Sequence, residues 1–185
     1  SPGPDKGTRR QGDKGKSVKV LTPDGNLTTA EKKRILLNNI YGVDIDVNAV
    51  EVTKLSLLLK CLEGETEASI QQQFSLWNER VLPTLDNNIK SGNSLIDTDF
   101  YGAELDFGLE KKIKPFNWRN AFPEVFKQGG FDSVIGNPPY IRIQSLAENS
   151  PGQIDYFGRK FKSASKGNYD IYVIFIEQAL NIANP

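Results

Sequence analysis

The 185-residue sequence contains no histidine, no methionine and a single cysteine, Cys61. Without histidine, the chain cannot supply a Ser-His-Asp triad, a Cys-His pair or a histidine-ligated metal site. One cysteine forms neither an internal disulfide nor a cysteine cluster for zinc or iron–sulfur, which is typical of a reducing compartment, so we expect a cytoplasmic protein. Cys61 lies in an apolar helical pattern, and we interpret it as a buried structural thiol.

Long apolar runs and net charge are also lacking. No apolar stretch approaches the roughly 18 residues needed to span a bilayer, so we expect no membrane contact. The 23 Lys and Arg residues balance 23 Asp and Glu residues. Any contact with nucleic acid must therefore depend on local positive charge, not on overall attraction.

The first 20 residues differ in composition from the rest of the chain. They include six Lys or Arg, four Gly and two Pro, and no aromatic residue. Such a segment buries too little surface to offset the entropy of ordering it. We predict a flexible basic arm over residues 1–20, more plausibly a solvated linker than a DNA-binding arm. Residues 21–185 then form one folded domain.

Strand and helix patterns alternate along this domain. A turn at 22–25 and a Thr28-x-x-Glu31 capping box precede the first helix, while Asp46 and Gly64 bound the second. Strands are predicted at about 40–45, 89–91 and 131–136, helices at about 29–38, 47–63, 67–77 and 171–182, and packing anchors at Phe116, Trp118, Phe122 and Phe126. The alternation indicates an α/β fold with a mostly parallel sheet.

The strongest chemical signal is Asn137-Pro138-Pro139-Tyr140, directly after the predicted strand 131–136. The two prolines fix φ and remove two N–H donors, which makes a stiff backbone corner. The Asn side chain adds an acceptor oxygen, and Tyr140 offers a flat face for stacking. This combination suits a planar, amine-bearing group such as adenine. The alternative is a Pro-rich turn with Tyr140 packed on the core.

Polar residues also follow the two earlier strands. Asp44 ends the strand 40–45, a position that commonly binds ribose hydroxyls in doubly wound sheets, although a turn carboxylate is an equal alternative. Asn93 follows the strand 89–91 and could bond an adenine edge, but taken alone it is more often a turn residue.

These motifs together resemble the S-adenosylmethionine-dependent DNA adenine-N6 methyltransferases, in particular the large restriction–modification and phage-defence type. The resemblance rests on Gly42-Val43-Asp44-Ile45-Asp46, on Gly92-Asn93-Ser94-Leu95, and on the Asn-Pro-Pro-Tyr motif after Phe-Asp-Ser-Val-Ile-Gly. The stretch Phe122-Pro123-Glu124-Val125-Phe126 strengthens it. The likeness extends over residues 20–183 and implies a Rossmann-like fold, S-adenosylmethionine as cofactor and double-stranded DNA as substrate.

The resemblance also implies roles for the cofactor-side residues. Asp44 would bind the cofactor ribose, and Ile45 would pack on its adenine. Asn93 would bond the edge of that adenine, with Ser94 beside it.

On the substrate side, the resemblance implies that Asn137 and the Pro138 carbonyl accept hydrogen bonds from the target N6 amine. Pro139 would complete the rigid corner, and Tyr140 would stack on the flipped base. Positioning and electrostatics would then supply most of the catalysis.

The sequence departs from the family at the cofactor loop. The family has a Gly-rich loop after its first strand, but no Gly-x-Gly occurs in this chain. We therefore expect an incomplete catalytic domain that lacks the first strand, that loop and a downstream target-recognition domain. Such a fragment would bind the cofactor weakly and would not methylate alone.

The same residues leave three other functions open. A glutamine-N5 protein methyltransferase shares the Asn-Pro-Pro-Tyr corner, and a non-catalytic DNA-binding scaffold could share the fold. Pro23-Asp24 with Glu31-Lys32-Lys33 matches a nuclease pattern, but we place these acids on a turn and a helix start, not on strands.

A loop is predicted over residues 142–168, either as a DNA contact or as a solvated loop. It mixes basic and aromatic residues: Arg142, Tyr156, Phe157, Arg159, Lys160, Phe161, Lys162 and Lys166.

Overall fold

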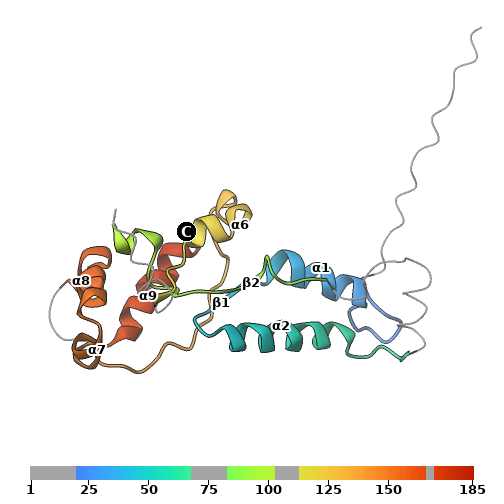
Figure 1. Ribbon diagram of the computed structural model, residues 1–185. Coiled ribbons are helices and arrows are strands. Elements are labelled where there is room, and N and C mark those ends of the chain that lie inside the picture. Colours follow the sequence, from blue (N-terminus) through green and yellow to red (C-terminus); the bar gives the residue numbers. More distant parts are fainter. Residues whose placement is uncertain (1–19, 68–82, 103–112, 166–168) are drawn as a thin grey trace, which may run out of the picture.

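A computed structural model describes residues 20–67, 83–102, 113–165 and 169–185 (Figure 1). The predicted basic arm over 1–20 and the predicted helix over 67–77 fall almost entirely outside these residues. Within the described ranges, no helix is both long enough and apolar enough to cross a membrane.

The first helix, α1 (Thr29–Asn39), follows a tight turn, as the sequence predicts. Gly25 takes φ +82° at the end of that turn, and its N–H donates to the Thr22 carbonyl at 3.0 Å. The Thr28 hydroxyl accepts the Glu31 N–H at 3.3 Å, which is one half of the predicted capping box. The Glu31 carboxylate instead pairs with Arg34 at 2.6 Å.

Two short parallel strands form the sheet. β1 (Gly42–Asp44) pairs with β2 (Ile89–Ser91) in the register Gly42↔Ile89 and Asp44↔Ser91. Between them in sequence lies α2 (Val47–Leu62), which begins at the N-cap Asp46 and packs on both strands. Parallel strands connected through a helix are the unit of α/β proteins, so the predicted class is confirmed at that level.

The apolar face predicted for residues 47–63 is only partly covered. Val50 and Cys61 are buried, with a core cluster that also includes Leu36, Leu85 and Ile89. Leu57 and Leu58 pack against this cluster and are partly buried. Four other apolar side chains of α2 stay exposed: Val47, Val52, Leu55 and Leu59.

The opposite end of the molecule is helical, and Figure 1 shows α7, α8 and α9 there, away from α1 and α2. The remaining elements are η1 (Thr98–Tyr101), α5 (Trp118–Ala121), α6 (Pro123–Lys127), α7 (Ile143–Asn149), α8 (Pro151–Lys160), η2 (Lys162–Ala164) and α9 (Ile171–Ile182). Their core is centred on Ile96, Phe157 and Ile174. The predicted helix over 171–182 is confirmed in its bounds, although Ile176 and Leu180 are exposed.

The prediction of a loop over residues 142–168 is wrong. Most of this segment forms α7, α8 and η2. Pro151 starts α8, where its missing N–H is harmless, and Tyr156 and Phe157 are buried in the core. The aromatic residues that suggested stacking in a loop therefore pack inside the protein.

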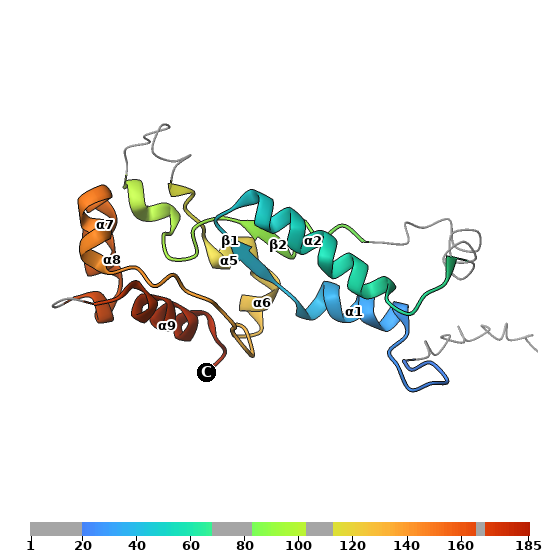
Figure 2. The same cartoon turned by 90° about the horizontal axis from the view of Figure 1, so that it is seen from below.

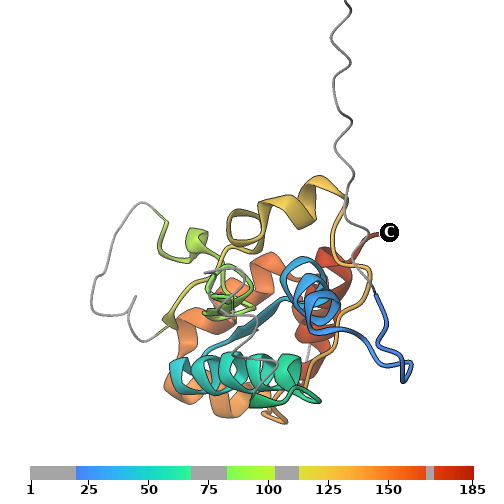
Figure 3. The same cartoon turned by 90° about the vertical axis from the view of Figure 1, so that its right-hand side faces the viewer.

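Aromatic rings connect the two ends of the molecule. Phe116 and Phe122 are buried, and Trp118 and Phe126 join them, which confirms the four predicted anchors. The ring of Tyr41 lies 5.2 Å from that of Phe122, at the start of β1. Viewed along the molecule, α1 and α2 lie side by side in front of the helical end (Figure 3).

The strand predicted at 131–136 is absent. Only Phe131 forms a bridge, a parallel one to Ala183, and the residues after it run without a ladder partner. The Ile135 side chain is 96% exposed. A strand is stabilised by its neighbours, and no described residue pairs with the backbone of residues 132–136.

Candidate functional site

The first half of the site lies at the carboxyl ends of β1 and β2. Asp44 ends β1 and Ile45 follows it, and Gly92 and Asn93 follow β2. Because the strands are parallel, both ends meet at one edge of the sheet, and the Gly92 N–H donates to the Asp44 carbonyl at 2.9 Å. The fold therefore brings Asn93 to the edge that holds Asp44 and Ile45, although Asn93 is far from both in the sequence.

The Asp44 carboxylate is exposed and only partly used by the protein. Its Oδ1 accepts the Asp46 N–H at 2.8 Å, while Asp46 separately caps α2 by accepting the Asn48 N–H at 2.9 Å. A carboxylate has about four lone-pair sites, so most of the acceptor capacity of Asp44 remains for a ligand. Ile45, beside it, is half-exposed.

The turn after β2 is tightly held. Gly92 packs against Phe116, where an added Cβ would lie 2.5 Å from a ring carbon. The Asn93 Oδ1 accepts the Leu95 N–H at 3.1 Å, so its amide nitrogen is the group left for a ligand. The Ser94 carbonyl accepts a hydrogen bond from the Trp118 Nε1–H at 3.0 Å. Ser94 also lines a cavity of about 230 Å³.

Lys114 connects the two strand ends by hydrogen bonds, and the sequence did not predict this role. Its Nζ donates to the Ile45 carbonyl at 2.8 Å, and its own carbonyl accepts the Asn93 N–H at 2.7 Å. Its φ is +51°, a left-handed conformation that is unusual for a residue with a side chain. The only local feature that could have indicated this role is a basic residue directly before Pro115.

The second half of the site is the corner formed by residues 137–140. Asn137, Pro139 and Tyr140 are exposed, and Tyr140 is 91% exposed. The Pro139 carbonyl accepts the Ile141 N–H at 3.0 Å, whereas no described residue bonds the Asn137 side chain or the Pro138 carbonyl. Two acceptors and one aromatic face are thus open. Within the described ranges, no hydrogen bond links this corner to Asp44 or Asn93.

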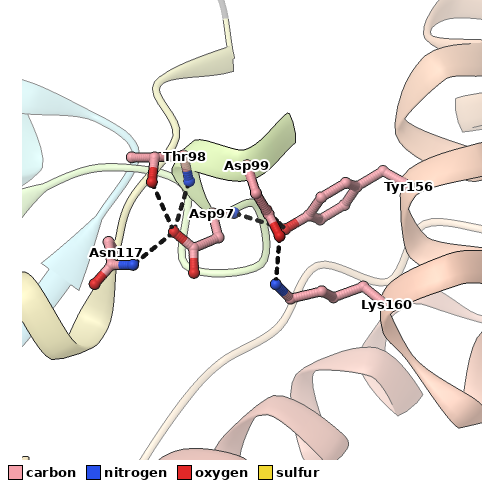
Figure 4. A network of polar contacts seen from close by, with 6 residues as sticks. All are labelled: Asp97, Thr98, Asp99, Asn117, Tyr156 and Lys160. Atoms are coloured by element: carbon pink, nitrogen blue, oxygen red, sulfur yellow. Dashed lines mark hydrogen bonds and ion pairs between the residues drawn. The ribbon is translucent and has the colours of Figure 1, made fainter. Parts of the chain in front are cut away.

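A polar network holds the segment after Ser94 against α8 (Figure 4). The Tyr156 hydroxyl accepts the Asp97 N–H at 3.0 Å and donates to Asp99 at 2.7 Å. Lys160 binds the other Asp99 oxygen at 2.7 Å. Burial and the neighbouring Asp99 carboxylate raise the pKa of Tyr156. Burial also acts to raise the pKa of Asp99, but its hydrogen bonds from Lys160 and Tyr156 lower that pKa overall.

The segment that was predicted to be a loop carries exposed positive charge. Arg142, Arg159 and Lys162 are exposed, whereas Lys160 is paired with Asp99. Lys166 lies outside the described residues. Arg159 also lines a cavity of about 650 Å³ between α7, α8 and η2, which no sequence motif predicted. The other lining residues are Ile143, Ile154, Asp155, Gly158, Ala164, Ser165 and Tyr169.

The residues of the nuclease-like pattern are not arranged around a metal. Asp24 is exposed on its turn, and the Glu31 carboxylate forms an ion pair with Arg34. No three acidic or cysteine side chains gather as metal ligands in the part of the chain that is described. Cys61 is buried, and that burial raises the pKa of its thiol, which fits a structural role.

Comparison with known proteins identifies the class. The family described as Eco57I restriction-modification methylase matches residues 38–185. The chain belongs to this family, which confirms the resemblance read from its motifs.

Individual relatives agree with the family. Over 172 residues the chain is 37% identical to the type II restriction enzyme and methyltransferase RM.Eco57I of Escherichia coli, covering 93% of this chain and 16% of the relative. Identity to the adenine-specific methyltransferase PglX of Streptomyces coelicolor is 25%, covering 83% and 12%. A putative type II restriction enzyme and methyltransferase of Methanocaldococcus jannaschii is 42% identical over 66 residues, covering 36% and 5%. The chain thus spans less than a fifth of the length of these relatives.

Proposed function

We propose that this chain is part of a larger DNA methyltransferase that transfers a methyl group from S-adenosylmethionine to adenine N6, within a restriction–modification or phage-defence system. The observation that carries the proposal is the open corner at 137–140, with two free acceptors beside an exposed Tyr140. The family match and the adenine-specific name of PglX support it.

The corner suits the chemistry of an exocyclic amine. The lone pair of such an amine is delocalised into the ring, so the nitrogen is a poor nucleophile. Acceptors at Asn137 Oδ1 and the Pro138 carbonyl would bind its two N–H groups and favour a pyramidal nitrogen. A duplex adenine must first leave the stack, which costs roughly a few kcal/mol, and stacking on Tyr140 would offset part of that.

The strand-end residues fit the nucleoside side of the cofactor. Asp44 has acceptor capacity for two ribose hydroxyls, the half-exposed Ile45 offers an apolar face for adenine, and the Asn93 amide can reach a ring edge. When bound, S-adenosylmethionine supplies the reactive methyl group on a sulfonium. We assign none of the described residues to its methionine end.

We further infer that the domain is an incomplete Rossmann-like methyltransferase fold. The two-stranded parallel sheet and the unpaired segment after Phe131 support this inference. In the complete protein, double-stranded DNA would approach the exposed side of the corner.

Asn137→Ala in the complete polypeptide tests the proposal. Loss of one preorganised hydrogen-bonding group typically lowers kcat by about 10²–10³-fold, and we expect a loss of that order in methyl transfer to duplex DNA. Asn87→Ala, at an exposed asparagine outside the site, is the control and should retain full activity. A protein substrate bearing glutamine is offered in parallel. Unchanged DNA methylation by Asn137→Ala, or methylation of the protein alone, would contradict the proposal.

A further inference from the structure

The cavity between α7, α8 and η2 has the size and the lining of a ligand site. Its volume is about 650 Å³, within the range of about 300–1,000 Å³ that small-molecule sites occupy. Ile143, Ile154 and Ala164 form an apolar wall, and a few polar side chains complete the lining. Such a mixture is typical of a pocket that binds an organic group, not of a site for a bare ion.

Two charged side chains of α8 are available in this cavity. Asp155 and Arg159 are one helical turn apart, yet they form no ion pair, and neither pairs with another charged side chain among the described residues. The Arg159 Nε–H donates to the Asp155 carbonyl at 3.3 Å, which leaves four of the five guanidinium donors. The cavity therefore offers a cation that suits a phosphate and a carboxylate that suits the amino group of a base.

The hydroxyl of Tyr169 is the third polar group of the cavity, and it lacks a partner. Its oxygen is buried, and no described residue forms a hydrogen bond with it. Burial raises the pKa of this phenol, so the hydroxyl stays protonated at neutral pH and can donate. Buried polar groups are normally hydrogen-bonded. An unpaired hydroxyl in the wall of a cavity is therefore expected where a ligand supplies the partner.

The cavity adjoins the open corner at 137–140. The chain passes from Tyr140 to Ile143 in three residues, which span at most about 11 Å. The Ile143 N–H donates to the Tyr169 carbonyl at 3.3 Å, so this passage is tied to the cavity wall. Figure 2 shows α7, α8 and α9 gathered at the end of the molecule opposite α1. Because one DNA strand advances about 3.4 Å per nucleotide, a base at the corner and a nucleotide in the cavity are separated by about three steps or fewer.

We propose that this cavity binds one nucleotide of the substrate DNA, about three steps or fewer from the target adenine. Arg159 would bind its phosphate, Tyr169 would donate to an oxygen of that phosphate or sugar, and Asp155 would accept from an amino group of its base. Arg142 and Lys162, exposed at the starts of α7 and η2, would bring positive charge to the neighbouring phosphates. The inference rests on the proposed function, because the nucleotide is placed relative to the flipped base.

A scan with neutral phosphates tests the proposal. The complete polypeptide is titrated, at one salt concentration, with labelled duplexes that each carry one uncharged methylphosphonate near the methylated adenine, and the Kd is measured by fluorescence anisotropy. At one position within three steps of that adenine, the native protein should lose about 10-fold in affinity, as for a hydrogen bond to a charged group. Arg159→Gln should show no further loss there. Arg119→Gln, at an exposed arginine that stacks on Phe126, should keep the full effect. Equal losses in the native protein and in Arg159→Gln at every position would overturn the proposal.

Tyr169→Phe tests the cavity without removing a charge. The ring is kept, and the hydroxyl has no partner in the free protein, so the unfolding midpoint should stay the same or rise. Affinity for DNA should nevertheless fall about 3–10-fold. Tyr41→Phe is the matched control, because its hydroxyl bonds to the Asn38 carbonyl at 3.3 Å, outside the cavity, and it should bind DNA like the native protein.

The two proposals are separated by the activity of the native protein. Methylation of the unmodified duplex reports on the proposed function alone. If that duplex is methylated but Tyr169→Phe binds it as tightly as Tyr41→Phe does, the nucleotide site in the cavity is contradicted and the proposed function stands.

Discussion

The Nζ of Lys114 donates a hydrogen bond to the carbonyl oxygen of Ile45 at 2.8 Å, across 69 positions of sequence. The Lys114 carbonyl also binds the N–H of Asn93, so one residue fixes both strand ends of the candidate cofactor site. It does so in a left-handed backbone conformation, which costs roughly 1 kcal/mol or more for a residue with a side chain. Strain that persists beside a binding site indicates that the surrounding contacts require this geometry.

Lys114→Met should weaken cofactor binding in the complete polypeptide. The substitution keeps the length of the side chain and the backbone contact to Asn93 but removes the bond to Ile45. We expect about a 3–10-fold increase in the Kd for S-adenosylmethionine, since one hydrogen bond contributes about 1 kcal/mol, measured by titration calorimetry. Lys127→Met, at a lysine paired with Glu124 on α6, serves as the control. Equal Kd values for both variants would contradict a positioning role for Lys114.

Asn88→Asp should destabilise the fold strongly. The buried Asn88 amide nitrogen lies 2.9 Å from the carbonyls of Leu37 and Ile40 and 3.3 Å from that of Leu36, so it binds the carboxyl end of α1. Aspartate would place a carboxylate against these oxygens. Burial of an unpaired charge is expected to lower the free energy of unfolding by about 3 kcal/mol or more.

Urea denaturation measures this loss, and the neighbouring residue gives a matched control. Asn87 is exposed, so Asn87→Asp adds the same charge without the buried contact and should change stability by less than about 0.5 kcal/mol. Similar unfolding midpoints for the two variants would show that Asn88 does not hold α1.

The contribution of Asp99 to stability should depend on pH. Its hydrogen bonds to Lys160 and Tyr156 lower its folded-state pKa below the unfolded value. A lowered pKa means that the stabilisation is present above the unfolded value, near pH 4, and is lost as the pH falls through the folded pKa. Asp99→Asn should therefore lower the free energy of unfolding at pH 7 by about 0.5–1 kcal/mol, a small figure because the carboxylate is largely exposed.

Thermal denaturation from pH 7 to pH 3 checks this sign. The difference between the unsubstituted protein and Asp99→Asn should shrink as the pH falls below 4. Asp132→Asn, at an exposed aspartate for which the described residues provide no hydrogen-bond partner, should show no such dependence. A difference that grows in acid would reverse the assignment.

Local signals predicted the elements that local interactions decide. The cap residues Thr28 and Asp46 start α1 and α2 as expected, and the strands β1 and β2 occur where apolar runs end in polar residues. Even the assignment of Asp44 to the strand end and Asp46 to the helix cap agrees with the geometry.

The remaining features depend on contacts that no local pattern contains. The segment 131–136 has strand residues but lacks a neighbour on its open side. The stretch after Arg142 was predicted to be a loop because it mixes basic and aromatic residues, yet it forms helices, and Tyr156 and Phe157 on α8 are buried. The link from Lys114 to Ile45 joins residues that no sequence window includes together.

Arg142→Gln should weaken DNA binding by the complete polypeptide. Arg142 is exposed two residues after Tyr140, just before α7. The backbone there pairs with Asp170, so the substitution leaves the fold unchanged. If its guanidinium binds one phosphate, the plot of log K against log salt should lose about 0.9 units of slope, with an affinity loss that is uniform across DNA sequences. Fluorescence anisotropy with labelled duplexes at several salt concentrations measures both quantities. Lys127→Gln, on the distant α6, should retain the original slope, and an unchanged slope for Arg142→Gln would assign this arginine to solvent instead of DNA.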